Sequence, residues 1–257
     1  MVRSRGVLWA AWCYLLLAVG LPLAALAREA SKLGLAGIWR EAARPEAVSA
    51  LGLTFGASLL AAFVNAGLGT WLAWSLERKP PPFARALDAL IDLPLALPSI
   101  VTGTLMLAVF GPLGWFKGRV PVLFERPAVL LVLLFVTLPL VVRAVQPVIE
   151  ALGHEEEAAA ATLGASSGET FRRVVWPALR PAVVGGAALA FARGMGEFGA
   201  MLLVTGNVPF KTEVASAYVY GRIESGEPGA AAGVACVLLL LSAGTLLFAD
   251  RRRRREA

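Results

Sequence analysis

The chain contains 257 residues, of which 58% are hydrophobic, and its mean hydropathy is +0.70. Such a composition is too apolar for an ordinary soluble domain and indicates a membrane protein. The net charge of +6 does not indicate nucleic-acid binding, because the Lys and Arg residues lie at the borders of apolar runs rather than on one basic face with interleaved aromatic residues.

Six apolar runs are long enough to cross a bilayer, whose hydrocarbon core of about 30 Å requires roughly 20 residues of helix. They cover residues 6–27, 47–76, 93–116, 127–149, 181–204 and 228–249. Charges interrupt the fourth run at Arg143 and the fifth at Arg193 and Glu197. We predict an all-α, multi-pass protein with six transmembrane helices in one domain, residues 1–257, with 47–250 as its core.

The distribution of basic residues predicts the orientation of these spans. An even number of spans places both termini on one side, and that side carries more Lys and Arg, including the run 251–255 beside the last span. We therefore predict cytoplasmic termini in the inner membrane and a cytoplasmic loop over residues 150–180. The run 251–255 is expected to contact anionic lipid headgroups. The first apolar run exceeds the usual 7–15 residues of a signal peptide, which favours an uncleaved first helix.

The segment that leads into the third span carries paired carboxylates and two prolines. Span two is expected to end at residues 77–79, because three prolines follow it. Asp88 and Asp92 are four residues apart and share a helical face. Pro94 and Pro98 fall in the first turns of the third span and predict a bent helix that lines a pathway. A kink that serves packing alone is the alternative.

The chain carries no signature of catalysis. His154 is the only histidine, which excludes a histidine-based metal cluster and a Ser-His-Asp triad. No G-x-x-x-x-G-K-[ST] sequence is present, so the chain does not bind ATP phosphates through a P-loop. We expect a non-catalytic pore subunit without metal or cofactor, and any ATP hydrolysis must come from another polypeptide.

The stretch 155–177, EEEAAAATLGASSGETFRRVVWP, is polar and helix-prone between two apolar runs. The alanine-rich segment 158–161 favours helix, and the acidic residues 155–157 suit the positive end of its dipole. Gly164 is expected to end this helix in the left-handed conformation. A second helix, 167–175, is expected to end before Trp176. Helix, turn and helix would form a knob that fits a socket on another protein, whereas an inert amphipathic hairpin is the alternative.

This stretch resembles the EAA loop of binding-protein-dependent ABC importer permeases, in which Glu-Ala-Ala precedes a glycine and an Ile-x-Leu-Pro ending. The pattern falls on Ala158, Ala159, Ala160, Gly164, Val174, Trp176 and Pro177. It departs from the family at two positions: Ala158 occupies the glutamate position, with Glu157 one place early, and Trp176 replaces the leucine. The resemblance implies the type I importer permease fold and makes residues 150–180, the coupling loop, the docking site for the ATPase.

Other segments resemble the sulfate and molybdate permeases, and specifically the T-type sulfate/thiosulfate permeases. They are residues 87–98, 142–148, 192–200 (ARGMGEFGA) and 204–214 (VTGNVPFKTEV). The resemblance implies half of a pathway for sulfate or thiosulfate. It also implies a second, W-type permease, two ATPase copies and an extracytoplasmic sulfate/thiosulfate-binding protein. A molybdate/tungstate permease is the alternative.

The fifth span carries a charge pair among glycines. Arg193 and Glu197 are four residues apart and are expected to share a helical face and to neutralise each other. Alternatively, Arg193 supplies positive potential to a passing dianion. Gly194, Gly196 and Gly199 would allow a helix of the partner subunit to approach closely. Two other classes stay open here: an enzyme that uses Asp88, Asp92 and Glu197, and a proton-coupled transporter.

Overall fold

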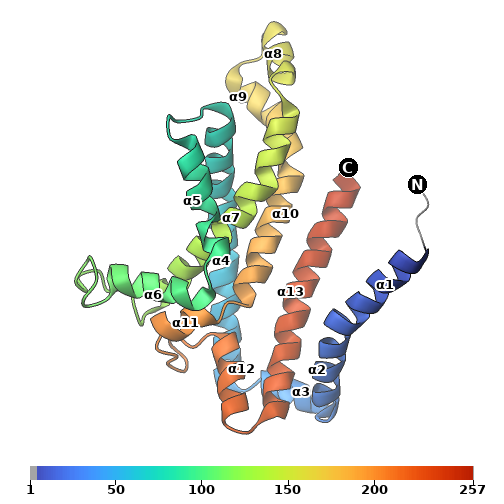
Figure 1. Cartoon of the computed structure of the whole chain (residues 1–257), viewed down its shortest axis with the longest axis vertical. Helices are drawn as coiled ribbons and strands as arrows, with labels where there is room; N and C mark the ends of the chain where they lie inside the picture. The colour runs from blue at the N-terminus through green and yellow to red at the C-terminus, as the bar shows by residue number, and fades with distance from the viewer. Residues whose placement is uncertain (1–4, 257) are drawn as a thin grey trace.

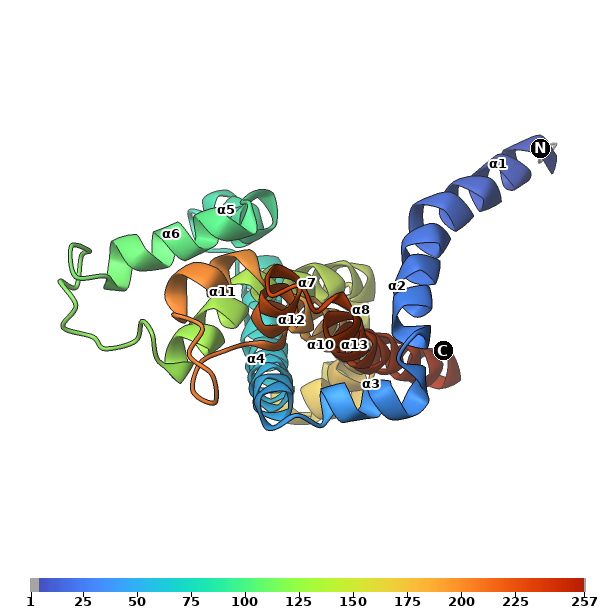
Figure 2. The same ribbon diagram turned by 90° about the horizontal axis from the view of Figure 1, so that it is seen from below.

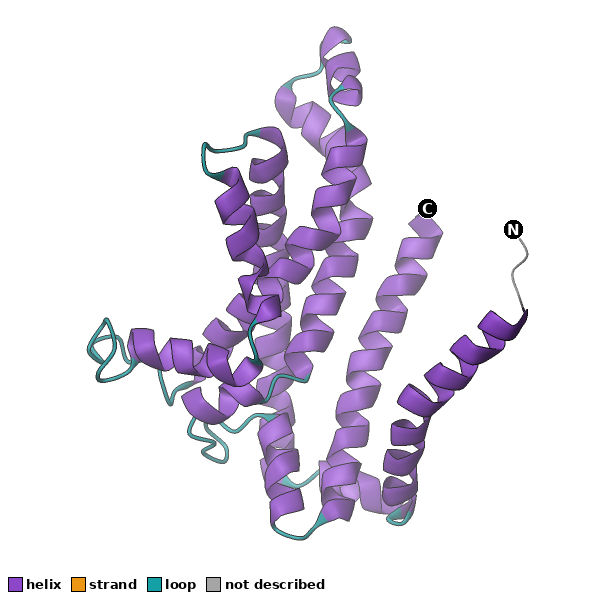
Figure 3. Ribbon diagram, viewed as in Figure 1, coloured by secondary structure: helices purple, strands orange, loops and turns teal. Residues whose placement is uncertain are grey.

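The computed structural model describes residues 5–256, with the side chains from Gly6 to Arg251, and this part of the chain is built from helices and turns without strands (Figure 3). Arg3 and the side chains of 252–255, most of the predicted lipid-binding run, lie outside the described residues. The elements are α1 (Arg5–Leu15), the π-helical η1 (Leu16–Gly20), α2 (Leu21–Ser31), α3 (Gly34–Ala42), α4 (Pro45–Arg78), α5 (Ala84–Ala96), α6 (Ser99–Phe110), α7 (Arg126–Leu152), α8 (Glu155–Thr162), α9 (Ser167–Thr170), the π-helical η2 (Phe171–Val175), α10 (Trp176–Met195), α11 (Gly199–Val204), α12 (Ala215–Glu224) and α13 (Pro228–Glu256).

Five helical stretches are long and apolar enough to cross a membrane, namely Gly6–Ser31, Pro45–Arg78, Arg126–Leu152, Ser167–Met195 and Pro228–Arg251. A sixth crossing is formed if α5 and α6, between which the chain bends by 116°, count as one broken span. The all-α architecture is therefore confirmed, and the six-span count holds with one span broken.

The third span differs from the prediction of one helix over 93–116. The helix begins earlier, at Ala84, and breaks between Ala96 and Ser99, so Pro94 lies buried near the end of α5 and Pro98 caps α6. Leu97 is extended, with φ −82° and ψ 134°, because a proline disfavours helical backbone in the residue before it. The bend was predicted correctly, but both prolines lie at the break rather than in a first turn.

The fifth span is also broken, although a continuous helix over 181–204 was predicted. α10 ends at Met195, and Gly196 to Phe198 separate it from the short α11. Gly196 caps the end of α10. Arg193 and Glu197 therefore lie on the two sides of a helix end rather than along one helical face.

Helices α4, α7 and α10 form the centre of the molecule, and α13 packs against α10 and α12 (Figure 1). Small residues bring these helices together. An added Cβ at Gly69 would lie 2.9 Å from the Val141 side chain, and one at Gly186 would lie 3.0 Å from the Val141 backbone. Close approach at glycine is a usual basis for helix association in membranes.

Helix α2 packs against α13 and α3, whereas α1 diverges from the body (Figures 1 and 2). The most apolar window of Gly6–Ser31 has no buried residue within the chain. The amphipathic α3 crosses the end of the molecule opposite α8 and exposes Trp39 (Figure 1).

Replacement of Gly69 by leucine is expected to destabilise the protein by about 1–3 kcal/mol, the range for overpacking a close contact. Gly67→Leu is the matched control, because it lies one half-turn away on α4 and an added Cβ there meets no atom within 4 Å. The measurement is the melting temperature of the purified chain in detergent. Equal melting temperatures for the two variants would contradict the tight α4–α7 contact.

Candidate functional site

The coupling loop stands at the end of the molecule that is farthest from α3 (Figure 1). Its first arm is the eight-residue helix α8, and Gly164 follows in the left-handed conformation with φ +83°. Both features were predicted. An added Cβ at Gly164 would meet no atom within 4 Å, so the requirement for glycine is conformational rather than steric.

The second arm was predicted to end before Trp176, but it continues past this residue. α9, η2 and α10 follow one another without a break. In the π-helical turn, the Trp176 N–H donates to the Phe171 carbonyl five residues back. This wider turn accommodates Pro177, which lacks an N–H, at the start of α10. Ser166 and Glu169 form a capping box at the start of α9, which the S-x-x-E spacing would have revealed.

The surface of the knob exposes small and apolar residues. Ala158 and Ala159 are exposed, and Leu163 is 88% exposed. Exposed apolar side chains on a polar projection mark a contact surface. Leu163 was missed in the sequence, where an apolar residue directly before the turn glycine was the available signal. The remaining motif residues differ in exposure: Ala160 and Val174 are half-buried, whereas Trp176 and Pro177 are exposed.

Glu157 points back toward the membrane-spanning body rather than outward. Its carboxylate lies 2.9 Å from Nη2 of Arg78, the last residue of α4. The same guanidinium donates to the Gly153 carbonyl and lies 3.3 Å from Nε2 of His154. Glu157 therefore makes a contact within the chain, one place before the position that the family pattern assigns to glutamate.

Arg143 fastens α5 to α7. Its Nε and Nη2 donate to the two carboxylate oxygens of Asp92 at 2.7 Å, and its Nη1 donates to Asp88 at 2.7 Å and to Gln146 at 2.5 Å. The shared face of Asp88 and Asp92 is thereby confirmed. The pairing of these aspartates with Arg143 was not predicted from the sequence, although an arginine in an apolar run requires a counter-charge.

These pairs argue against an acidic catalytic centre. Asp88 and Asp92 bind Arg143, whereas Glu197 binds Arg193 at a separate place. The described residues contain no group of three or more His, Cys, Asp or Glu that could hold a metal ion.

Glu197 joins the two helix breaks. Its Oε2 accepts from Nη1 of Arg193 at 2.7 Å, and its Oε1 accepts from the Ser99 hydroxyl and from the Ala200 N–H at 3.3 Å. Ser216 of α12 donates to the Glu197 carbonyl at 2.6 Å. The Glu197 side chain is only 1% exposed, whereas that of Arg193 is 42% exposed and reaches the surface of the chain. The predicted ion pair is present, with one buried and one accessible partner.

Two of the three glycines predicted to face a partner subunit face the chain itself. An added Cβ at Gly194 would lie 3.0 Å from Ser58 of α4, and one at Gly199 would lie 3.0 Å from Ser99 of α6. Gly196 is exposed. Close approach of helices was the right physical reason, but at Gly194 and Gly199 the approaching helices belong to the same chain.

The segment 204–214 forms a tight loop between α11 and α12. Thr212 is buried and donates to the Thr205 carbonyl at 2.7 Å, while Asn207 adopts a positive φ of 49°. Burial raises the pKa of the neighbouring Glu213 carboxyl above its usual value, although Arg222 opposes the shift.

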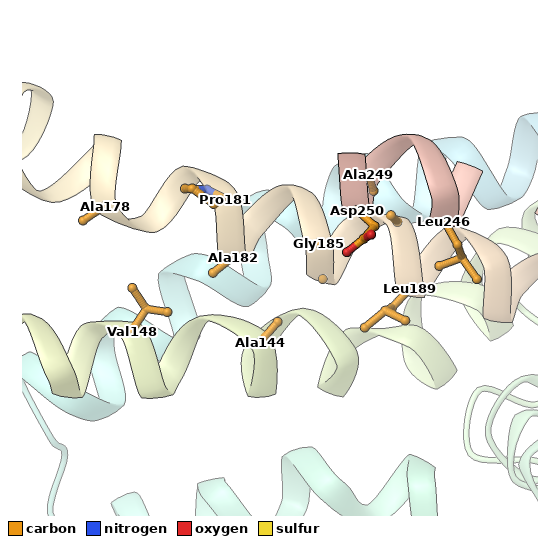
Figure 4. Close-up of a pocket in the computed structure, with 12 residues that line it drawn as sticks. Ala144, Val148, Ala178, Pro181, Ala182, Gly185, Leu189, Leu246, Ala249 and Asp250 are labelled. Atoms are coloured by element: carbon orange, nitrogen blue, oxygen red, sulfur yellow. The ribbon is translucent and has the colours of Figure 1, made fainter. Parts of the chain in front are cut away.

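Four cavities in the described part of the chain are lined by residues other than Arg193 and Glu197, the predicted pathway residues. One, of about 620 Å³, lies between α7, α10 and the end of α13 and is lined by Ala144, Ala182, Gly185 and Asp250, among others (Figure 4). Its walls are mostly small apolar side chains, which do not suit a hydrated dianion.

The sequence resembles known transport proteins over most of its length. The model of the family described as binding-protein-dependent transport system inner membrane component matches residues 65–255. The chain is 40% identical over 241 residues to the sulfate transport system permease protein CysT of Synechocystis sp., covering 91% of this chain and 84% of the relative. It is 38% identical over 235 residues to the protein of the same name from Escherichia coli, covering 90% and 84%.

The fold is similar to that of solved importers. A chain of the bacterial alginate ABC transporter in complex with its periplasmic protein superposes with a TM-score of 0.80 at 16% identity, covering 98% of this chain and 93% of that chain. A chain of the MetNI methionine ABC transporter, in an inward-facing conformation, gives a TM-score of 0.65 at 17% identity, covering 82% and 95%. At these identities the likeness concerns the fold alone.

Exchange of the charges, Arg193→Glu with Glu197→Arg, is expected to destabilise the chain by at least about 3 kcal/mol, because buried position 197 is surrounded by hydrogen-bond donors that cannot stabilise a guanidinium. Glu197→Gln retains an acceptor for Ser99 and Ala200 and should cost about 1 kcal/mol. Melting temperature and monodisperse yield in detergent measure both effects. A swapped variant as stable as the wild type would show that the donors around Glu197 are not selective for a carboxylate.

Proposed function

The chain belongs to the family of binding-protein-dependent transport system inner membrane components, and from this premise we propose that it forms half of the membrane pathway of an ATP-driven importer of sulfate or thiosulfate. The observation that carries the proposal is the similarity, over nine-tenths of the chain, to permeases named for sulfate transport. Those relatives favour sulfate over molybdate or tungstate as the cargo.

The coupling loop is the proposed contact with the ATPase. Its exposed face carries Ala158, Ala159 and Leu163, and a glycine turn holds its two arms together. Small side chains allow two backbones to approach closely, which suits a knob that enters a groove on another protein. ATP hydrolysis is assigned to that other protein, and the permease itself is non-catalytic.

Arg193 is the proposed contact with the passing anion. It reaches the surface of the chain beside the two helix breaks, and Pro94 and Pro98 form the bend at one of them. Discontinuous helices near the centre of a transporter commonly surround its substrate. Glu197 reduces the net charge that the anion meets, and this favours release over trapping.

The proposed assembly contains a second, W-type permease, two copies of the ATPase and an extracytoplasmic sulfate/thiosulfate-binding protein. The exposure of Arg193 on the surface of a single chain is consistent with a pathway that the second permease completes. We propose that the coupling loop and both termini face the cytoplasm. In support, α13 ends on the side of the molecule that carries α8 (Figure 1), and basic residues are more frequent on the proposed cytoplasmic side.

Vesicles that contain the complete transporter are expected to take up labelled sulfate, with thiosulfate competing well and molybdate competing poorly. The control is the same complex with the P-loop lysine of the ATPase replaced, which should take up none, because that lysine contacts the ATP phosphates. Uptake that persists in this control would favour a gradient-driven transporter. Loss of molybdate uptake on deletion of this chain, with sulfate uptake unchanged, would overturn the assignment of the cargo.

Replacement of Gly164 by valine is expected to leave membrane insertion intact and to reduce both ATPase recovery and uptake. A left-handed conformation costs a residue with a Cβ about 1–2 kcal/mol, which corresponds to roughly a 5- to 30-fold change in an equilibrium. Co-purification of the ATPase with the permease is the measurement.

Two matched variants control this experiment. Gly164→Asn should be milder, because asparagine tolerates the left-handed region better than a β-branched residue does. Ala158→Glu places the family residue on an exposed position and should be tolerated. Wild-type ATPase recovery and uptake in Gly164→Val would overturn the role of this turn.

A further inference from the structure

The end of α4 contacts both arms of the coupling loop. On the first arm, Arg78 binds the Gly153 carbonyl, approaches the His154 ring and pairs with Glu157. On the second arm, Phe171 meets the Trp74 ring edge-on, with centroids 5.8 Å apart. No other helix end in the described chain makes ion-pair contact with α8.

Arg78 and Trp74 themselves form one unit. The guanidinium carbon of Arg78 lies 5.5 Å from the centroid of the Trp74 ring, a cation–π distance. The Arg78 side chain is only 8% exposed, which is unusual for a charge at a helix end. The next residue, Lys79, is exposed and forms no ion pair in the described part of the chain.

The joint that Arg78 contacts is a backbone pivot. Gly153, between α7 and α8, has φ 66° and ψ −162°, a conformation that is essentially restricted to glycine. α8 has eight residues, none of them buried, so it is too short to be a stable helix alone. A short helix beyond a glycine joint keeps its direction only if side chains brace it.

We propose that Arg78 is a positioning residue that braces α8 against α4, so that a displacement of the coupling loop moves α4 together with α7 and α10. The proposal rests on the proposed function only in that the ATPase is the source of the displacement. Trp74 extends the brace to the second arm through Phe171. The bracing itself is a property of the permease and can be measured without cargo.

The first experiment measures amide hydrogen exchange in the purified complex. Arg78→Gln should accelerate exchange across residues 154–162 on the order of tenfold, because loss of the brace raises the population of the locally open state. Exchange in α7 and α10 should stay unchanged. Lys79→Gln is the matched control, since it removes the adjacent charge without removing a contact of α8, and it should behave as the wild type does.

The second experiment measures ATP hydrolysis and sulfate uptake in vesicles. Arg78→Gln should retain the ATPase but raise the number of ATP molecules hydrolysed per sulfate on the order of tenfold, a loss of coupling within the usual range. Arg78→Lys should rescue part of the effect, because an ammonium can pair with Glu157 but cannot also reach the Gly153 carbonyl in the same fork geometry. If Arg78→Gln only reduced the amount of folded protein, ATP hydrolysis and sulfate uptake would fall by the same factor and their ratio would not change.

Glu157→Gln serves as a second variant for the case in which Arg78→Gln fails to fold, because Glu157 is 27% exposed and lies at the surface. It should give a smaller acceleration of exchange in α8, and its effect should not add to that of Arg78→Gln. Wild-type exchange in α8 for both variants, or an equal effect of Lys79→Gln, would overturn the proposal. If the wild-type complex takes up no sulfate, the proposed cargo is wrong. The hydrogen-exchange result then still tests whether Arg78 braces α8.

Discussion

Hydrocarbon cannot hydrogen-bond to a polar group, and this constraint decides where the chain bends and where its charges lie. Each interruption of a helix frees backbone groups, and each charge within an apolar run requires a partner. The structure satisfies both needs at the same places. Ser99 follows the break at Pro98, and Glu197 lies in the break after α10. Their side chains bind each other and the Ala200 N–H. Each interruption therefore supplies hydrogen-bond partners for polar groups at the other.

The same constraint explains why charged residues act as fasteners between helices. α5 follows a proline-rich turn and contacts α7 more than any other helix, and Arg143 provides the polar part of that contact through two aspartates. Apolar side chains gain little by choosing a neighbouring helix over lipid. A guanidinium finds no counter-charge among lipid tails, so its pairing with two carboxylates specifies that α5 lies beside α7.

Much of this was accessible from the sequence, and the failures share a cause. Hydropathy located the long helices, and the polar stretch between spans four and five predicted the α8 helix and the Gly164 turn. The sequence could not assign partners across long separations, such as Arg143 with Asp88 and Asp92 or Arg78 with Glu157, because the distance between helices is a tertiary property. It also misplaced helix ends in the third span, in the fifth span and in the coupling loop. Pro177 was expected to stop a helix, yet a π-helical turn absorbed it, and Gly196 ended a helix that hydropathy continued to Val204.

Helix α10 has a mechanical consequence. It runs without interruption from Trp176 to Met195, which at about 1.5 Å per residue is about 30 Å. One end continues directly from the second arm of the coupling loop, and the other carries Arg193 beside the break that holds Glu197. A stiff rod turns a small rotation at one end into a shift at the other in a single step, with no chain of side-chain rearrangements between them. A movement of the coupling loop and a movement at Arg193 are then expected to occur together, because one helix carries both ends.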